Sequence, residues 1–198
     1  SVPPRERRVG APAARGPGRL AGVVGFGGKK VGFDGSGTVK QFAVGPVNKP
    51  TWTEPTLALA AKGELDLTAD DVRFDRLRVE RDGLAAEAKG AVYDLSKSQD
   101  LKMDGTVAYD LKKLEPKLRE FLGKTATVSG ADTRPFRLAG KLGGQKDFVL
   151  GLSGAAAVGW QGLKAYGFDV GAADLKASLD GGIVTCSPVA ATFGGGQV

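Results

Sequence analysis

Apolar and polar residues alternate over long stretches of this chain, most clearly between Gly83 and Leu111. Apolar or small residues occupy every second position from Leu84 to Val92, and again from Leu101 to Tyr109. Successive side chains of a strand point to opposite faces of a sheet, so this period of two indicates two half-buried strands. We therefore expect a long, one-sided β-hairpin whose loop is Ser96-Lys-Ser-Gln-Asp100.

The two halves of this hairpin contain nearly the same phrase, Gly90-Ala-Val-Tyr-Asp-Leu95 and Gly105-Thr-Val-Ala-Tyr-Asp-Leu111. Glycine also begins similar runs at Gly63 and Gly140, at irregular spacing. One interpretation is an ordinary antiparallel sheet whose strands start after glycine turns. The other is a series of hairpins added to one elongated sheet. The pattern leaves both open.

The same alternation predicts strands along most of the chain. Val72 and Phe74 occupy even-numbered positions and Leu77 and Val79 odd-numbered ones, so a regular strand would point the two pairs to opposite faces. This predicts a β-bulge at Asp75-Arg76, which would absorb one residue. Turn residues predict hairpins at Gly35-Ser-Gly37, Asp82-Gly83 and Asp180-Gly181-Gly182. The further strands that we expect lie at 30–34, 38–44, 55–61, 63–68, 124–128, 135–142, 147–153, 165–170, 174–179, 182–186 and 190–198.

The period changes to that of a helix after Asp110. Apolar residues recur at helical spacing from Leu111 to Leu122, with Asp110 as a possible N-cap and Gly123 as a stop. Pro116 either starts this helix late or bends it. We expect the apolar stripe of this helix, at about 111–122, to pack on the sheet.

These patterns predict a mainly β fold, an elongated, curved antiparallel sheet of successive hairpins with one short helix. The composition fits, because 31 glycines among 198 residues and only 7% aromatic residues suit turns and thin strands. Residues 1–22 are rich in Arg, Pro, Gly and Ala and contain five arginines against one glutamate. We interpret them as a disordered basic linker or arm, followed by a single β-rich domain at 23–198 that is a fragment of a longer chain.

The residue inventory argues against an enzyme. The chain has no histidine and a single cysteine, Cys186, which excludes His-based catalysis, an internal disulfide and Cys-cluster metal sites. The acidic residues between Asp66 and Asp75 lack the spacing of a calcium loop. Acidic residues also interrupt the arginines at 73–81, which argues against a nucleic-acid groove. We therefore expect no catalytic residue, cofactor, metal or nucleic-acid partner.

The remaining candidate for function is the apolar side of the sheet, which either lines an open groove or forms a closed core. Its predicted members are Leu84, Val92, Leu101, Met103, Val107, Tyr109, Phe136, Leu138, Phe148 and Leu150.

The last third of the chain resembles the C-terminal signature of the AsmA-like family. The residues that carry the resemblance are Tyr166-Gly-Phe-Asp-Val170, Asp174-Leu-Lys-Ala-Ser-Leu-Asp-Gly-Gly-Ile-Val184, Ser187-Pro-Val189 and Ala191-Thr-Phe-Gly-Gly-Gly-Gln-Val198. Upstream, Lys89-Gly-Ala-Val-Tyr-Asp-Leu95 and Asp104-Gly-Thr-Val-Ala-Tyr-Asp-Leu111 are similar to strand phrases of the same family. The resemblance extends over about Lys30 to Val198.

The resemblance implies a bacterial envelope protein whose β-rich body extends into the periplasm from an inner-membrane anchor outside this fragment. It also implies a role in outer-membrane biogenesis or lipid transfer, with phospholipid acyl chains and envelope proteins as partners. Our first hypothesis is thus a non-enzymatic domain that offers an apolar sheet face to lipid. The alternative is a structural or protein-interaction β module with a closed core and no lipid ligand.

Overall fold

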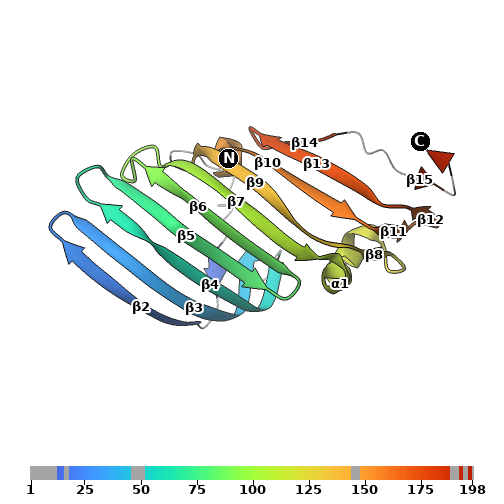
Figure 1. Cartoon of the computed structure of the whole chain (residues 1–198), viewed down its shortest axis with the longest axis horizontal. Helices are drawn as coiled ribbons and strands as arrows, with labels where there is room; N and C mark the ends of the chain where they lie inside the picture. The colour runs from blue at the N-terminus through green and yellow to red at the C-terminus, as the bar shows by residue number, and fades with distance from the viewer. Residues whose placement is uncertain are drawn as a thin grey trace, which may run out of the picture.

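The computed structural model describes residues 13–15, 18–45, 52–143, 148–187, 192–193 and 196–197. Within these ranges, eleven strands form one antiparallel sheet and five short strands form a second (Figure 1). The large sheet contains β1 (Ala13–Arg15), β2 (Gly18–Gly27), β3 (Lys30–Gly45), β4 (Trp52–Asp66), β5 (Asp71–Arg81), β6 (Leu84–Tyr93), β7 (Asp100–Asp110), β9 (Ala131–Lys141), β10 (Leu152–Trp160), β13 (Ala173–Asp180) and β14 (Ile183–Cys186). The small sheet contains β8 (Thr127–Ser129), β11 (Gly162–Ala165), β12 (Phe168–Val170), β15 (Thr192–Phe193) and β16 (Gly196–Gln197).

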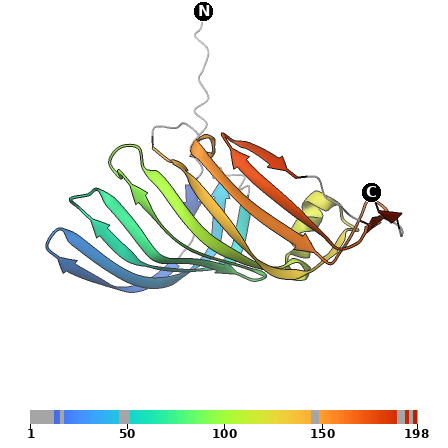
Figure 2. The same ribbon diagram turned by 45° about the horizontal axis from the view of Figure 1, so that its top comes forward.

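The large sheet is built from hairpins, because strands that follow one another along the chain from β2 to β7 also pair side by side. The helix α1 (Leu111–Leu122) and β8 interrupt this series between β7 and β9. The sheet is elongated and curved, as the tilted view in Figure 2 shows. The predicted fold class, a mainly β antiparallel sheet of successive hairpins with one helix, is confirmed.

The helix begins and ends where the sequence predicts. The Asp110 carboxylate accepts hydrogen bonds from the backbone N–H groups of Lys112 and Lys113, which satisfies donors that the first turn leaves free. Gly123 ends the helix at φ 94°, and its N–H donates to the carbonyl of Arg119. The helix continues through Pro116 rather than starting after it.

The predicted bulge is present in β5. The register between β5 and β6 shifts between Phe74 and Leu77, so one residue of β5 has no partner there. The extra residue returns Leu77 and Val79 to the face that Val72 and Phe74 occupy. It also turns Arg81 toward that face.

One predicted turn and one predicted strand break are wrong. Gly35-Ser-Gly37 lies inside the single strand β3, and the break expected between residues 61 and 63 lies inside β4. Both edges of β3 are paired over this region, with β2 and with β4. Because these ladders satisfy the backbone along its whole length, the glycines remain extended instead of turning.

Other expectations differ at the ends of the chain and after β9. Residues 18–22, which we expected in a disordered arm, belong to β2, and Ala13–Arg15 pairs with β3 as β1. The rest of residues 1–22 lies outside the described residues. The strand expected at 147–153 is wrong, because Phe148–Gly151 forms the 3-10 helix η1 and β10 starts only at Leu152. The hairpin at Asp180-Gly181-Gly182 joins β13 to β14 as predicted.

Buried side chains are few for a chain of this length. Among the described residues, no side chain is less than 2% exposed. One buried cluster, of Tyr109, Leu111 and Val128, lies at the α1 end of the sheet, with Leu84, Leu114, Leu118, Val158, Trp160 and Leu163 packed against it. Hence, away from the α1 end, no second layer covers the large sheet in the part of the chain that the structure describes.

Candidate functional site

One face of the large sheet is apolar from β2 to β14. Residues paired across antiparallel strands point to the same face, so the register assigns the members of each face. Val24, Phe33, Gly63, Phe74, Gly90, Met103 and Leu138 form one continuous row across seven strands. Neighbouring rows of this apolar face contain Val31, Leu59, Leu65, Val72, Leu77, Val79, Leu84, Val92, Leu101, Val107, Tyr109, Phe136, Leu152, Leu175, Leu179 and Val184.

The opposite face is charged and carries ion pairs. Arg76 and Arg78 both contact the Glu87 carboxylate, at 2.9 and 3.1 Å, and Lys62 lies 3.2 Å from Asp34. The two arginines hold the pKa of Glu87 below its usual value. This outer face is solvated, as the interleaved charges of β5 predict.

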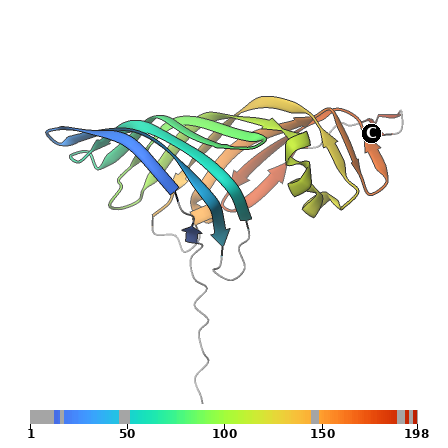
Figure 3. The same ribbon diagram turned by 90° about the horizontal axis from the view of Figure 1, so that it is seen from below.

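The apolar face meets α1 at one end of the sheet. Leu84 and Tyr109 belong to this face and pack in the cluster that includes Leu114 and Leu118 of α1. Figure 3 shows α1 and the adjoining ends of β3 and β4 on the hollow side of the arch. Beyond the α1 end, no described element covers the apolar face.

Several apolar side chains of this face are largely exposed. Phe26 is 81% exposed, Val184 64% and Val24 56%. Burying a large apolar side chain stabilises a protein by about 1.5–3 kcal/mol, so leaving such groups in water is costly. An exposed apolar patch of this extent is typical of a surface that binds lipid or another protein.

Eight of the ten predicted face residues share the apolar face, namely Leu84, Val92, Leu101, Met103, Val107, Tyr109, Phe136 and Leu138. Phe148 and Leu150 do not, because they belong to η1 rather than to a strand. Leu150 is 55% exposed and touches the turn at Gly182 instead. The side chain of Phe148 is outside the described residues.

The predicted set omits the apolar residues of β2 to β5. Val24, Phe33, Leu59 and Leu77 surround a hollow of about 480 Å³ whose floor is formed by Gly35, Gly37 and Ala61. The hollow exists because the small residues at its floor do not fill it, and the larger apolar side chains surround it. The alternation around Phe33 and around Leu59 was visible in the sequence, but the turn expected at 35–37 and the strand break expected between residues 61 and 63 separated these residues from the rest of the face.

Aromatic rings fill the glycine positions on the same face. A side chain at Gly63 would meet the backbone of Arg73 and the ring of Phe33, which also contacts Phe74 edge-on at 5.8 Å between ring centres. A side chain at Gly105 would meet the ring of Phe136 at 2.8 Å. The rings of Phe33 and Phe136 thus cover the backbone at Gly63 and Gly105, so that the apolar surface has no gap at these glycines.

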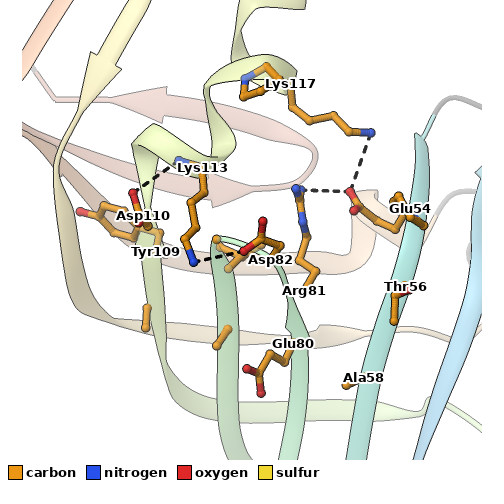
Figure 4. Close-up of a pocket in the computed structure, with 16 residues that line it drawn as sticks. Glu54, Thr56, Ala58, Glu80, Arg81, Asp82, Tyr109, Asp110, Lys113 and Lys117 are labelled. Atoms are coloured by element: carbon orange, nitrogen blue, oxygen red, sulfur yellow. Dashed lines mark hydrogen bonds and ion pairs between the residues drawn. The ribbon is translucent and has the colours of Figure 1, made fainter.

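A second, polar pocket lies at the α1 end of the large sheet, with a volume of about 800 Å³. The start of β4, the β5–β6 turn, the end of β7 and α1 surround it (Figure 4). Glu54 is only 4% exposed, and its Oε1 lies 3.0 Å from Arg81 Nη1 and 3.9 Å from Lys117 Nζ. Lys113 lies 3.2 Å from Asp82.

Among the acidic residues at 66–75, Asp66 and Asp70 accept hydrogen bonds that stabilise turns and loops. Asp66 accepts hydrogen bonds from the backbone of Thr68 and Ala69, and Asp70 accepts from the hydroxyl and N–H of Ser96. These hydrogen bonds hold the pKa of both carboxyls below its usual value. Among the described residues, no group of three acidic, His or Cys side chains could hold a metal ion.

No helix among the described residues is both long and apolar enough to cross a membrane. Comparison of the chain with protein-family models, with curated proteins and with solved structures finds no match.

Proposed function

We propose that this chain is a non-enzymatic domain of a bacterial cell envelope that binds lipid acyl chains on the apolar face of its curved sheet. The observation that carries the proposal is the extent of that face, which runs from β2 to β14 and which, among the described residues, has no covering layer beyond its α1 end. Acyl chains are apolar and adaptable in shape, and they would remove this surface from water without any specific polar contact.

The resemblance to the AsmA-like family supports the same proposal. The phrases that carry it, Lys89–Leu95 and Asp104–Leu111, begin on β6 and β7, in the middle of the apolar face, and end just after these strands. On this proposal the domain lies in the periplasm and contributes to outer-membrane biogenesis or lipid transfer.

The alternative function is a structural or protein-interaction module. A closed core would require a covering layer over Met103 and Val107, and no described element provides one. A protein partner could still cover the face, so the experiment must separate lipid from protein as the occupant.

The substitution Met103→Glu places a charge in the middle of the apolar face, between Gly90 and Leu138. Its matched control is Thr106→Glu, which lies on the exposed opposite face of the same strand. We expect mass spectrometry of organic extracts to find phospholipid bound to the purified parent chain and to Thr106→Glu, and to find it depleted at least severalfold in Met103→Glu.

The thermal unfolding midpoint provides the second readout. Both variants should unfold close to the parent chain, because an open face leaves the new carboxylate hydrated. A Met103→Glu variant that fails to fold, together with a parent chain that carries no lipid, would instead support the module with a closed core.

A further inference from the structure

Three exposed aromatic side chains gather where α1 meets the small sheet. Phe121, in the last turn of α1, is 73% exposed, and Tyr166 and Phe168, at the turn of the β11–β12 hairpin, are 72% and 62% exposed. The Tyr166 hydroxyl donates a 3.2 Å hydrogen bond to the carbonyl of Phe121. Figure 1 shows α1 and this hairpin at one end of the long axis of the molecule. We call Phe121, Tyr166 and Phe168 the aromatic tip.

Tyr166 occupies a backbone conformation that its side chain disfavours. Tyr166 and Gly167 form the two-residue turn between β11 and β12, with φ of 53° and 82°. A hairpin turn with positive φ at both residues usually has the sequence Asn-Gly or Asp-Gly. The other described non-glycine residues with positive φ are Asp or Gln. Because the fold alone would favour Asn at position 166, an exposed tyrosine there indicates a role outside folding.

Hydrogen bonds within the protein satisfy polar backbone groups at the tip. The last carbonyls of a helix have no partner within the helix and commonly bind water. Here the Tyr166 hydroxyl binds the carbonyl of Phe121, and the N–H of Gly123 binds the carbonyl of Arg119. The Arg119 side chain also donates from Nε to the carbonyl of Ala126, at 2.9 Å. These contacts lower the cost of moving the tip out of water, since unpaired polar groups are expensive in apolar surroundings.

The charged side chains around the tip balance one another. They contribute three positive and three negative charges, from Glu115, Arg119, Glu120, Lys124, Lys164 and Asp169. Two oppositely charged pairs among them are in contact, at 2.9 Å on the β11–β12 hairpin and at 2.7 Å within α1. A balanced surrounding produces no strong field of one sign, so apolar contact is the main attraction that the tip offers.

The size of the tip favours a lipid bilayer over a protein partner. Large aromatic side chains bury about 150–250 Å² each, so three rings that are about two-thirds exposed offer roughly 400 Å². Each side of a standard protein complex contributes about 800 Å², from about 20–30 residues. Aromatic side chains are also typical of segments that insert shallowly where lipid headgroups meet acyl chains.

We propose that the aromatic tip docks the chain on a phospholipid bilayer, with Phe121, Tyr166 and Phe168 inserted where the headgroups meet the acyl chains. This docking goes beyond the proposed function, which concerns acyl chains on the apolar face. The two surfaces adjoin, because α1 packs in the cluster that contains Leu84 and Tyr109 of that face. A docked tip therefore holds the α1 end of the apolar face next to the bilayer.

Flotation with vesicles of phosphatidylethanolamine and phosphatidylglycerol tests the docking. Tyr166→Asn removes the ring and introduces a residue that the turn favours. It should lower the vesicle-bound fraction at least severalfold and leave the thermal unfolding midpoint unchanged or raised. Phe168→Thr, which keeps a β-prone residue in β12, should also lower binding severalfold. The control Val23→Thr removes a 74% exposed apolar side chain that pairs with Asp34 on the charged face, and it should match the parent chain.

Tyr166→Trp reports where the side chain lies. Vesicles of brominated phospholipid should quench the tryptophan fluorescence of this variant more strongly than that of the parent chain, which contains two tryptophans. Equal quenching would overturn the insertion. A Tyr166→Asn variant that floats like the parent chain would also overturn it, and so would one that unfolds at a lower temperature, because Tyr166 would then have a structural role.

The docking and the proposed function can fail separately. A parent chain that yields extracted phospholipid but does not float with vesicles overturns the docking and leaves the proposed function standing. A parent chain that floats through the tip but yields no bound phospholipid supports the docking and overturns the proposed function.

Discussion

At the scale of the residue, Asp70 connects two loops that lie far apart in the sequence. Its carboxylate accepts from Ser96, and its carbonyl accepts from the N–H of Leu95. These contacts tie the β4–β5 turn to the β6–β7 loop at the end of the sheet opposite α1. The hydroxyl and N–H of Ser96 hold the pKa of Asp70 below its usual value of 3.8.

This pKa predicts a pH dependence of stability. Because the pKa of Asp70 is lower in the folded state than in the unfolded state, ionised Asp70 stabilises the fold above pH 4. That stabilisation is lost as the pH falls through the folded value. Asp70→Asn, which tolerates the local φ of 58°, should therefore lower the urea midpoint at pH 7 and approach the parent chain at pH 3. An equal loss at both pH values would contradict the argument, and Asp104→Asn is the control.

Gly63 tests the close approach of strands and rings on the apolar face. A Cβ added there would lie in contact with the carbonyl of Arg73 and 2.8 Å from the Phe33 ring. Gly63→Ala should destabilise the chain by about 1–3 kcal/mol in urea unfolding, the usual cost of overpacking. Gly32→Ala, whose Cβ meets no atom closer than 4.0 Å, should change little. Equal effects of the two substitutions would show that the rings do not pack as described.

At the scale of the element, α1 has boundaries that local chemistry determines. Replacing the N-cap in Asp110→Ala should lower the free energy of unfolding by about 1 kcal/mol, because two backbone donors lose their acceptor. Circular dichroism and urea unfolding would measure this, with Asp104→Ala on the exposed face of β7 as the control. A loss no larger than that of the control would contradict the capping role.

The elements show which features of the fold sequence could predict. The hairpin of β6 and β7, the bulge at Asp75-Arg76 and the helix depend on residues near one another in sequence, so their patterns were readable. The glycines at 35–37 were misread because their conformation depends on β2 and β4 on either side, which is tertiary information. The 3-10 turn at Phe148 was misread because its apolar alternation is the same as that of a strand.

The features of the candidate site likewise divide into those that local sequence could predict and those that depend on tertiary contacts. The alternation of apolar and polar residues identified the members of the apolar face on β6, β7 and β9, because this alternation can be seen within each strand without knowing its neighbours. The hollow at Phe33, Leu59 and Leu77 requires the cross-strand register, and the pocket around Glu54 requires α1 to approach the start of β4. No local signal marks Glu54 as buried, since its partners Arg81 and Lys117 are 27 and 63 residues away.

At the scale of the whole molecule, the large sheet has a charged face and an apolar face, and the buried cluster that the described residues form lies at the α1 end. A single layer of this kind must cover its apolar face with a ligand or a partner to remove that surface from water. On the proposed function, lipid acyl chains lie against this face.

Photocrosslinking tests that claim most directly. A benzophenone amino acid would be placed at position 103, on the apolar face, or at position 106, on the opposite face of the same strand. After irradiation with phospholipid vesicles or in cells, intact mass spectrometry would detect lipid adducts. We expect a phospholipid adduct at position 103 and none at 106. Adducts at neither position, or equal adducts at both, would contradict it.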